Sequence, residues 1–160
     1  MRNIIIALAF IAVGVTTTSC EGVRLAGDWN KNKAYEVGDI CRHNGKRGVV
    51  FEVSSDGKSG KILGLEEFYG TWYEAVAWSE DYGKGWTLPT TEELCVIYEN
   101  RNTINTTLKR VVGGEEVTPY WYWSSGAYDD IYAYRIYMYN GDIEYGGKNS
   151  HCNARLVAEF

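Results

Sequence analysis

The sequence predicts an α+β domain built on an antiparallel sheet, and three observations support this fold class. The expected elements run in the order strands, helices, strands, without the strand–helix alternation of a parallel sheet. Two capping boxes mark the starts of helices in the middle of the chain. Asn-Gly dipeptides stand between strand-like segments near both ends, and such dipeptides favour hairpin turns.

The first strands are expected between residues 35 and 65. Tyr35 to Val53 reads as two strands joined around Asn44-Gly45, and its second half is rich in β-branched and aromatic residues. A turn-rich loop follows, and Lys61 to Leu65 returns as a third strand.

The helices are expected after residue 70. Thr71 and Glu74 form the first capping box, and that helix should end at Gly83. Thr90 and Glu93 form the second. Apolar or amphipathic residues then recur at the spacing of one helical face, at Leu94, Ile97, Tyr98 and Arg101. Residues 102–112 are compatible with a further short helix.

An aromatic segment, residues 120–145, holds eight of the thirteen tyrosines. It predicts a strand from Tyr120 to Ser124, a second from Ile131 to Tyr139, a type I′ turn at Asn140-Gly141 and a third strand from Asp142. A closing strand over residues 154–160 should share one face, formed by Ala154, Leu156, Ala158 and Phe160.

Large residues occupy both faces of the strand at 131–139, which leaves two interpretations open. The sheet is either buried on both faces, or it presents a binding surface, since tyrosine combines wide contact area with a polar tip. If Trp121 and Trp123 point inward, Tyr122 should be exposed. The candidate ligand-binding residues are therefore Tyr122, Tyr128, Asp129, Asp130, Tyr132, Tyr137, Tyr139, Asn140, Asp142, Tyr145, Asn149 and His151.

The N-terminus indicates export. Residues 1–19 combine Arg2, an apolar stretch of about a dozen residues and a small-residue end, as in a signal peptide. Thr17 to Cys20 resembles the lipobox of bacterial lipoproteins, which implies lipidation of Cys20, a tether over 20–33 and a domain over 34–160. We expect a lipoprotein facing the periplasm or outer membrane, or the cell surface. The alternative is a plain secretory signal with an incidental cysteine.

Composition argues against several function classes. A net charge of −5 gives no electrostatic footprint for nucleic acid, and no Cys/His spacing suggests zinc. No nucleophile motif accompanies either histidine, so we expect neither catalysis nor a cofactor. A calcium site at Asp129, Asp130, Asp142 and Glu144 is the less favoured interpretation of that acidic group. In an exported chain, Cys41, Cys95 and Cys152 allow one disulfide, with the pair left open.

Three ordered motifs carry a resemblance: Gly85 to Leu94 (GWTLPTTEEL), Tyr122 to Ser125 (YWSS) and the closing Arg155-Leu156-Val157. Together they resemble the bacterial C-type-lectin-like domains grouped as the Fibrobacter succinogenes major paralogous domain and the Lcl C-terminal domain. The resemblance implies that the first and last strands pair, that two helices flank a sheet, and that ligands bind at the C-terminal strands and loops. Leu156 and Ala158 depart from the family pattern, where many members have Arg or Cys.

Members of that family are generally non-enzymatic surface proteins that bind glycans or other partners. We therefore expect a lipid-anchored recognition domain for an extracellular glycan or protein. Two alternatives remain: a structural subunit of a surface assembly that buries the aromatic patch, or a variable binding protein diversified by a retroelement, to which this chain is similar in composition only.

Overall fold

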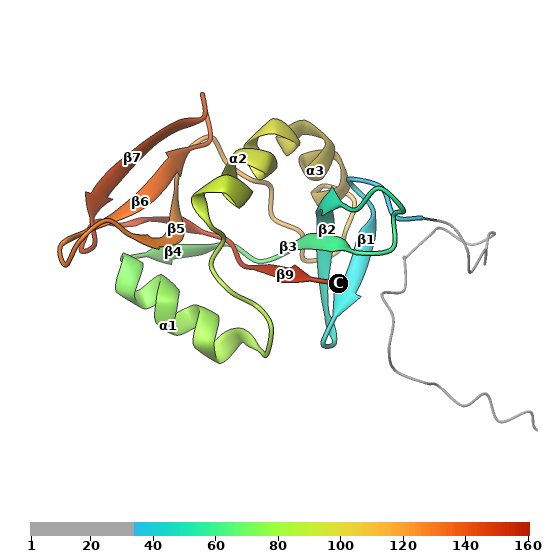
Figure 1. The fold of residues 1–160 in the computed structure, drawn as a ribbon, viewed down its shortest axis with the longest axis horizontal. Helices are drawn as coiled ribbons and strands as arrows, with labels where there is room; N and C mark the ends of the chain where they lie inside the picture. The colour runs from blue at the N-terminus through green and yellow to red at the C-terminus, as the bar shows by residue number, and fades with distance from the viewer. Residues whose placement is uncertain (1–33) are drawn as a thin grey trace, which may run out of the picture.

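The computed structural model of this protein describes residues 34–160 and shows an α+β architecture with two sheets and three helices (Figure 1). The α+β class is confirmed, but the strands form two sheets where the sequence predicted one. The expected signal peptide, the lipidated Cys20 and the tether lie outside the described residues.

A four-stranded antiparallel sheet has the order β1-β2-β3-β9, with β1 at Ile40–His43, β2 at Lys46–Val53, β3 at Gly60–Gly64 and β9 at Val157–Glu159. A five-stranded sheet has the order β4-β8-β5-β6-β7, with β4 at Phe68–Gly70, β8 at Cys152–Ala154, β5 at Trp121–Ala127, β6 at Tyr132–Tyr137 and β7 at Asp142–Gly147. The helices are α1 at Trp72–Tyr82, α2 at Thr91–Glu99 and α3 at Arg101–Leu108.

Both capping boxes are confirmed. The Thr71 hydroxyl accepts from the Glu74 N–H, and the Glu74 carboxylate accepts from the Thr71 N–H at 2.8 Å. Thr90 and Glu93 repeat this exchange at the start of α2. Each cap typically contributes about 1 kcal/mol, because it satisfies backbone donors that the first helical turn leaves free. The short third helix also forms, directly after α2.

The two Asn-Gly dipeptides have different outcomes. Asn44 and Gly45 both have positive φ (47° and 82°) and join the paired residues His43 and Lys46, as a two-residue type I′ turn requires. The same turn predicted at residues 140–141 is wrong, because of the two only Gly141 has positive φ (83°). There Tyr137 pairs with Asp142, which leaves a four-residue loop.

Core packing explains this longer loop. The Met138 side chain is fully buried, and its N–H donates to the Tyr120 carbonyl at 2.9 Å. Met138 therefore packs in the core and does not continue β6, which ends at Tyr137. Gly141 lies against the Tyr98 ring, where an added Cβ would come within 2.7 Å of a ring carbon. Glycine is therefore required at this position by both its φ and its neighbour.

The closing segment differs from the expected single strand. It is divided into β8 and β9, which belong to different sheets, and Arg155-Leu156 crosses between them. The expected shared environment is present, since Ala154, Leu156 and Ala158 are all buried in one cluster. The pairing of first and last strands is wrong for this chain: β9 pairs with β3, and β1 lies at the other edge of that sheet.

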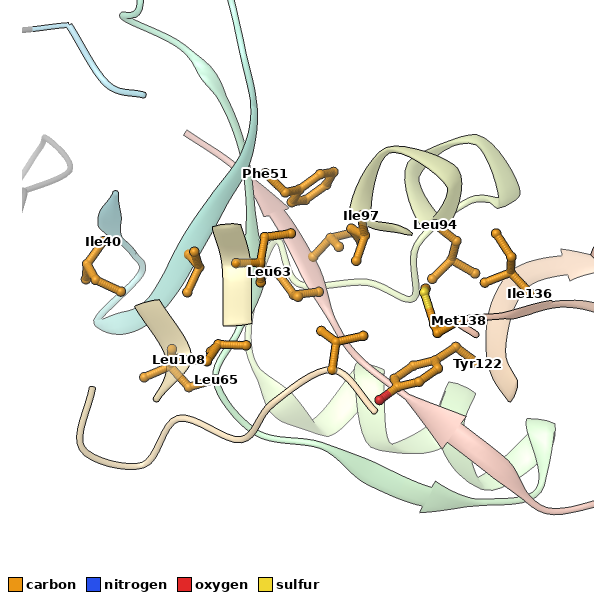
Figure 2. Packing of buried hydrophobic residues seen from close by; sticks show 14 residues of the cluster. Ile40, Phe51, Leu63, Leu65, Leu94, Ile97, Leu108, Tyr122, Ile136 and Met138 are labelled. Carbon is orange, nitrogen blue, oxygen red and sulfur yellow. The ribbon is translucent and has the colours of Figure 1, made fainter. Parts of the chain in front are cut away.

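Two buried clusters hold the layers together. One joins α2 and α3 to both sheets through residues that include Leu94, Ile97, Leu63, Ile136 and Met138 (Figure 2). The other lies on the α1 side and includes Trp86 and Trp123, both buried as expected. Helices α1 and α2 therefore cover opposite faces of the five-stranded sheet (Figure 1), as expected for two flanking helices.

None of the three pairings among Cys41, Cys95 and Cys152 that the sequence left open is formed. Cys95 and Cys152 are both free thiols, and every pairing among the three domain cysteines would use one of them. Burial raises the pKa of each of these two thiols above its ordinary value.

Within residues 34–160, none of the helices is long and apolar enough to span a bilayer.

Candidate functional site

The candidate residues gather on β6, β7 and the loop before them, and the strand register divides them between two faces. Residues paired directly across an antiparallel ladder share a face. Tyr134 is paired with Tyr145, and Ile136 with Ile143, so these lie on one face. Arg135 is paired with Glu144, and Tyr137 with Asp142, so these lie on the other.

The first face carries what we call the tyrosine cluster: Tyr128, Tyr132, Tyr134 and Tyr145. Tyr128 and Tyr145 stack with ring centroids 4.5 Å apart and planes 8° from parallel. Tyr134 meets Tyr128 edge to face at 5.6 Å, and Tyr132 meets Tyr145 in the same way at 5.5 Å. Tyr128 and Tyr145 remain about half exposed (52% and 51%), so the cluster is preorganised and still accessible.

The second face carries a different group, which we call the arginine–aromatic cluster: Trp121, Arg135, Tyr137 and Glu144. The Trp121 and Tyr137 rings stack at 4.8 Å, and the Arg135 guanidinium lies 4.5 Å from the centre of the Trp121 ring. Arg135 also forms an ion pair with Glu144. Arg135 contacts both Trp121 and Glu144, so this group is closely packed and holds β5, β6 and β7 together.

The loop that supplies Tyr128 is held from within. The Asp129 carboxylate accepts from the N–H groups of Ile131 and Tyr132 at 2.8 and 2.7 Å. These hydrogen bonds stabilise the turn. The Asp129 carboxylate, which we expected to contact a ligand, is therefore already engaged within the loop. Asp130 is exposed, and its carbonyl accepts from the Tyr73 hydroxyl at 3.3 Å.

Lys148 fastens the same loop to α1. Its side chain is buried, and its ammonium donates to the Asp129 carbonyl at 2.7 Å while lying 4.6 Å from the centre of the Trp72 ring. The Lys148 N–H donates to Ile131 and its carbonyl accepts from Trp72. The tyrosine cluster is therefore positioned by contacts that reach the first turn of a helix.

Tyr122 is not part of this surface, and its predicted exposure is wrong. The side chain is 1% exposed, and its hydroxyl donates to the Glu67 carboxylate and lies 3.0 Å from the Thr118 hydroxyl. Trp123 is also fully buried, on the other face. Both faces of this strand are covered by helices, so alternation could not indicate which one faces solvent.

The remaining candidates are dispersed. Tyr139 is 69% exposed beside Tyr137, with ring centroids 6.0 Å apart. The Asn140 amide donates to the Asp142 carboxylate at 2.6 Å, so each side chain already has a hydrogen-bond partner within the turn. Asn149 is exposed in the turn after β7. His151 is exposed beside the Tyr69 ring of β4, at 5.7 Å.

Sequence reasoning missed Tyr134, Trp121 and Arg135 as members of these clusters. The strand register would have identified them, because it pairs Trp121 of β5 with Tyr137 of β6, and Tyr134 of β6 with Tyr145 of β7. In residues 34–160 we find no group of three His, Cys, Asp or Glu side chains arranged to hold a metal ion. Among the four carboxylates considered for calcium, Asp129, Asp142 and Glu144 have the protein partners described above.

A buried polar network lies behind the site and joins the two sheets. Arg155 is 1% exposed and donates through one terminal nitrogen to the Gly64 and Leu65 carbonyls, each at 2.9 Å. Its other terminal nitrogen donates to the Glu115 carbonyl, and Nε lies 3.5 Å from Glu67. The arginine singled out by the closing motif is therefore a structural residue at the crossover between β8 and β9.

Glu67 provides a pH-dependent prediction. Burial raises the pKa of its carboxyl above 4.5, outweighing the hydrogen bond from Tyr122 and the charge of Arg155. The folded state then holds this proton more tightly than the unfolded chain, so the contribution of Glu67 to stability falls as pH rises through and above that value. We expect the free energy of unfolding of the wild type, minus that of Glu67→Gln, to decrease from pH 4 to pH 7.

Urea denaturation of both proteins across this pH range measures the difference. Subtracting the variant removes the effect of every other carboxyl group. A difference that increases with pH would show that the attraction of Arg155 outweighs burial.

Comparisons with known proteins add no assignment. No protein-family model matches the chain, and no curated protein is significantly similar to it in sequence. The resemblance to C-type-lectin-like domains therefore rests on the three motifs alone.

Proposed function

We propose that this protein is a non-catalytic recognition protein that binds an extracellular glycan or protein through the tyrosine cluster. The observation that supports the proposal is the convergence of four tyrosines from three segments on one face, partly exposed and held by mutual ring contacts. Ordering these side chains in advance lowers the entropy that binding would otherwise cost.

The chemistry of the cluster suits a glycan first. Aromatic rings stack on the apolar faces of sugars, and the phenol hydroxyls supply donors and acceptors for sugar hydroxyls. The same residue type dominates protein-binding surfaces, so a protein ligand is the second possibility for this site. A C-type-lectin-like ancestry, which we also propose from the three motifs, would place ligand binding at these strands and loops.

The N-terminal pattern supplies the proposed location. Lipidation at Cys20 would anchor the protein to a membrane through several acyl chains, and residues 20–33 would tether the domain on the exported side. Binding would then take place in the periplasm or at the cell surface, where glycans and surface proteins are present.

Glycan arrays and pull-downs with the full chain, with and without Ca²⁺, test the proposal. We expect the double variant Tyr132→Ser/Tyr145→Ser to bind the identified ligand at least about tenfold more weakly, because central aromatic residues dominate binding energy. The matched control is Tyr69→Ser/Tyr120→Ser, which removes two more exposed tyrosines (67% and 62%) outside the cluster.

The control should bind as the wild type does. Equal weakening in both double variants, or no ligand in any panel, would contradict the tyrosine cluster as a binding site. Binding that requires Ca²⁺ would show that carboxylates take part as well.

A further inference from the structure

Strand β7 forms an open edge of the five-stranded sheet. It is the last strand in the sheet order, and Asp142 to Tyr145 are all exposed (Figure 1). Its six residues pair with β6 without a bulge, and it contains neither lysine nor proline. Proteins usually protect edge strands by shortening them or by adding bulges, proline or charged side chains, and of these β7 has only the charges of Asp142 and Glu144.

The other edges in residues 34–160 are shorter or engaged. Strands β4 and β9 have three residues each, and β1 has four, including Arg42. Strand β9 also exchanges backbone hydrogen bonds with Thr87 at 3.0 and 2.8 Å. The edge at β7 is therefore the longest one that the structure describes.

The register shows which backbone groups of β7 point outward. Lys148 donates its N–H to Ile131 at 2.8 Å, which makes this a hydrogen-bonded position of the β6–β7 ladder. Hydrogen-bonded and non-hydrogen-bonded pairs alternate along an antiparallel ladder, so Asp142, Glu144 and Gly146 face β6. The N–H and C=O groups of Ile143, Tyr145 and Gly147 consequently point away from β6, but the Gly147 carbonyl already accepts from the Ser150 N–H at 2.8 Å.

We propose that two copies of this chain associate edge to edge through β7, antiparallel, about a two-fold axis at Glu144. In this register Ile143 of each copy pairs with Tyr145 of the other. The outward N–H and C=O groups of Ile143 and Tyr145 on the two copies then form four backbone hydrogen bonds in total. The position of the axis follows from the chain itself. Ile143 and Tyr145 are the two outward-facing residues of β7 that the following turn does not engage, and they lie at equal distances on either side of Glu144.

The side chains suit this pairing. Ile143 and Tyr145 are each about half exposed (49% and 51%) on one face, and the dimer brings them together as two apolar cross-strand pairs. Glu144 meets its own copy on the other face, where like charges repel, but each carboxylate has its own counter-ion in Arg135. The contact is small, so the dimer is weak and its population should rise with protein concentration.

This association goes beyond the proposed recognition function and does not depend on it. It has one consequence for that function, because Tyr145 also belongs to the tyrosine cluster. Pairing through β7 would place two tyrosine clusters side by side on one continuous sheet, which would favour ligands with repeated units through avidity.

Cysteine cross-linking tests the register directly. Residue 144 would lie opposite itself at a non-hydrogen-bonded position, where Cα atoms are about 4.5 Å apart and a disulfide fits. We expect the full chain with Glu144→Cys to form a covalent dimer of doubled mass under mild oxidation. The matched control, Asp142→Cys on the same strand and face, would lie opposite Gly146 and should remain monomeric.

Sedimentation at increasing concentration provides a second measurement that needs no new cysteine. The wild type should shift toward the dimer mass, and Ile143→Pro should remain monomeric, since proline removes an outward N–H without breaking a bond to β6. Equal cross-linking by the two cysteine variants would overturn the proposed register. A wild type that stays monomeric at its highest soluble concentration would overturn the association itself, whether or not the tyrosine cluster binds a ligand.

Discussion

Replacing Arg155 by methionine is expected to lower the free energy of unfolding by about 3–5 kcal/mol, the range typical for removing one partner of a buried ion pair. Methionine keeps the apolar length of the side chain but removes every donor. The carbonyls of Gly64, Leu65 and Glu115 then lose their partner, and the Glu67 carboxylate loses its counter-ion. Such a loss is a large fraction of the 5–15 kcal/mol that stabilises a typical domain.

Chemical denaturation of the full chain measures this loss, and Lys109→Met is its control. Lys109 and Glu116 approach more closely than the buried pair, at 3.1 Å, but the Lys109 side chain is 60% exposed. An exposed pair contributes about 0–1 kcal/mol, so the control should unfold almost as the wild type does. Similar losses in the two variants would show that burial is not what gives Arg155 its importance.

Replacing Trp123 by alanine is expected to cost a comparable amount, about 3–5 kcal/mol. The indole is fully buried, and its Nε1–H donates to the Gly70 carbonyl at 3.1 Å. Its cluster includes Ala75, Ala133 and Ala154, whose short side chains cannot fill the space that the ring would leave. The substitution therefore combines a cavity with an unsatisfied carbonyl in β4.

Trp123→Phe separates these two contributions, because phenylalanine fills much of the cavity but donates no hydrogen bond. Its loss in urea denaturation should lie well below that of Trp123→Ala. A control at Tyr120→Ala, three residues away and 62% exposed, should change stability little. A large loss for Tyr120→Ala would instead indicate that this whole segment is sensitive to any substitution.

Local sequence signals are reliable where the chemistry is complete within a few residues. The capping boxes at Thr71 and Thr90 form as expected, because each needs only a side chain and a backbone group three positions apart. The turn at Asn44-Gly45 forms for the same reason. At Asn140-Gly141 the same dipeptide is overruled by Met138, whose burial cannot be inferred from its immediate neighbours.

The candidate site was predictable as a region but not in its faces. The tyrosine excess marks residues 120–145, and the exposed ring cluster lies in that segment. Alternation along a strand gives two sets of residues but not the identity of the wet face, and here helices cover both faces of Tyr122 and Trp123. Asp129 illustrates a second limit, because a loop carboxylate serves a turn as readily as a ligand.

The position of β8 and β9 has a consequence for the timing of folding. Residues 152–159 supply an interior strand to one sheet, between β4 and β5, and the closing strand to the other. A growing chain that lacks these residues has a divided sheet and a second open edge, so it cannot complete either layer. We therefore expect both sheets of this domain to be completed only after residues 152–159 have been synthesised.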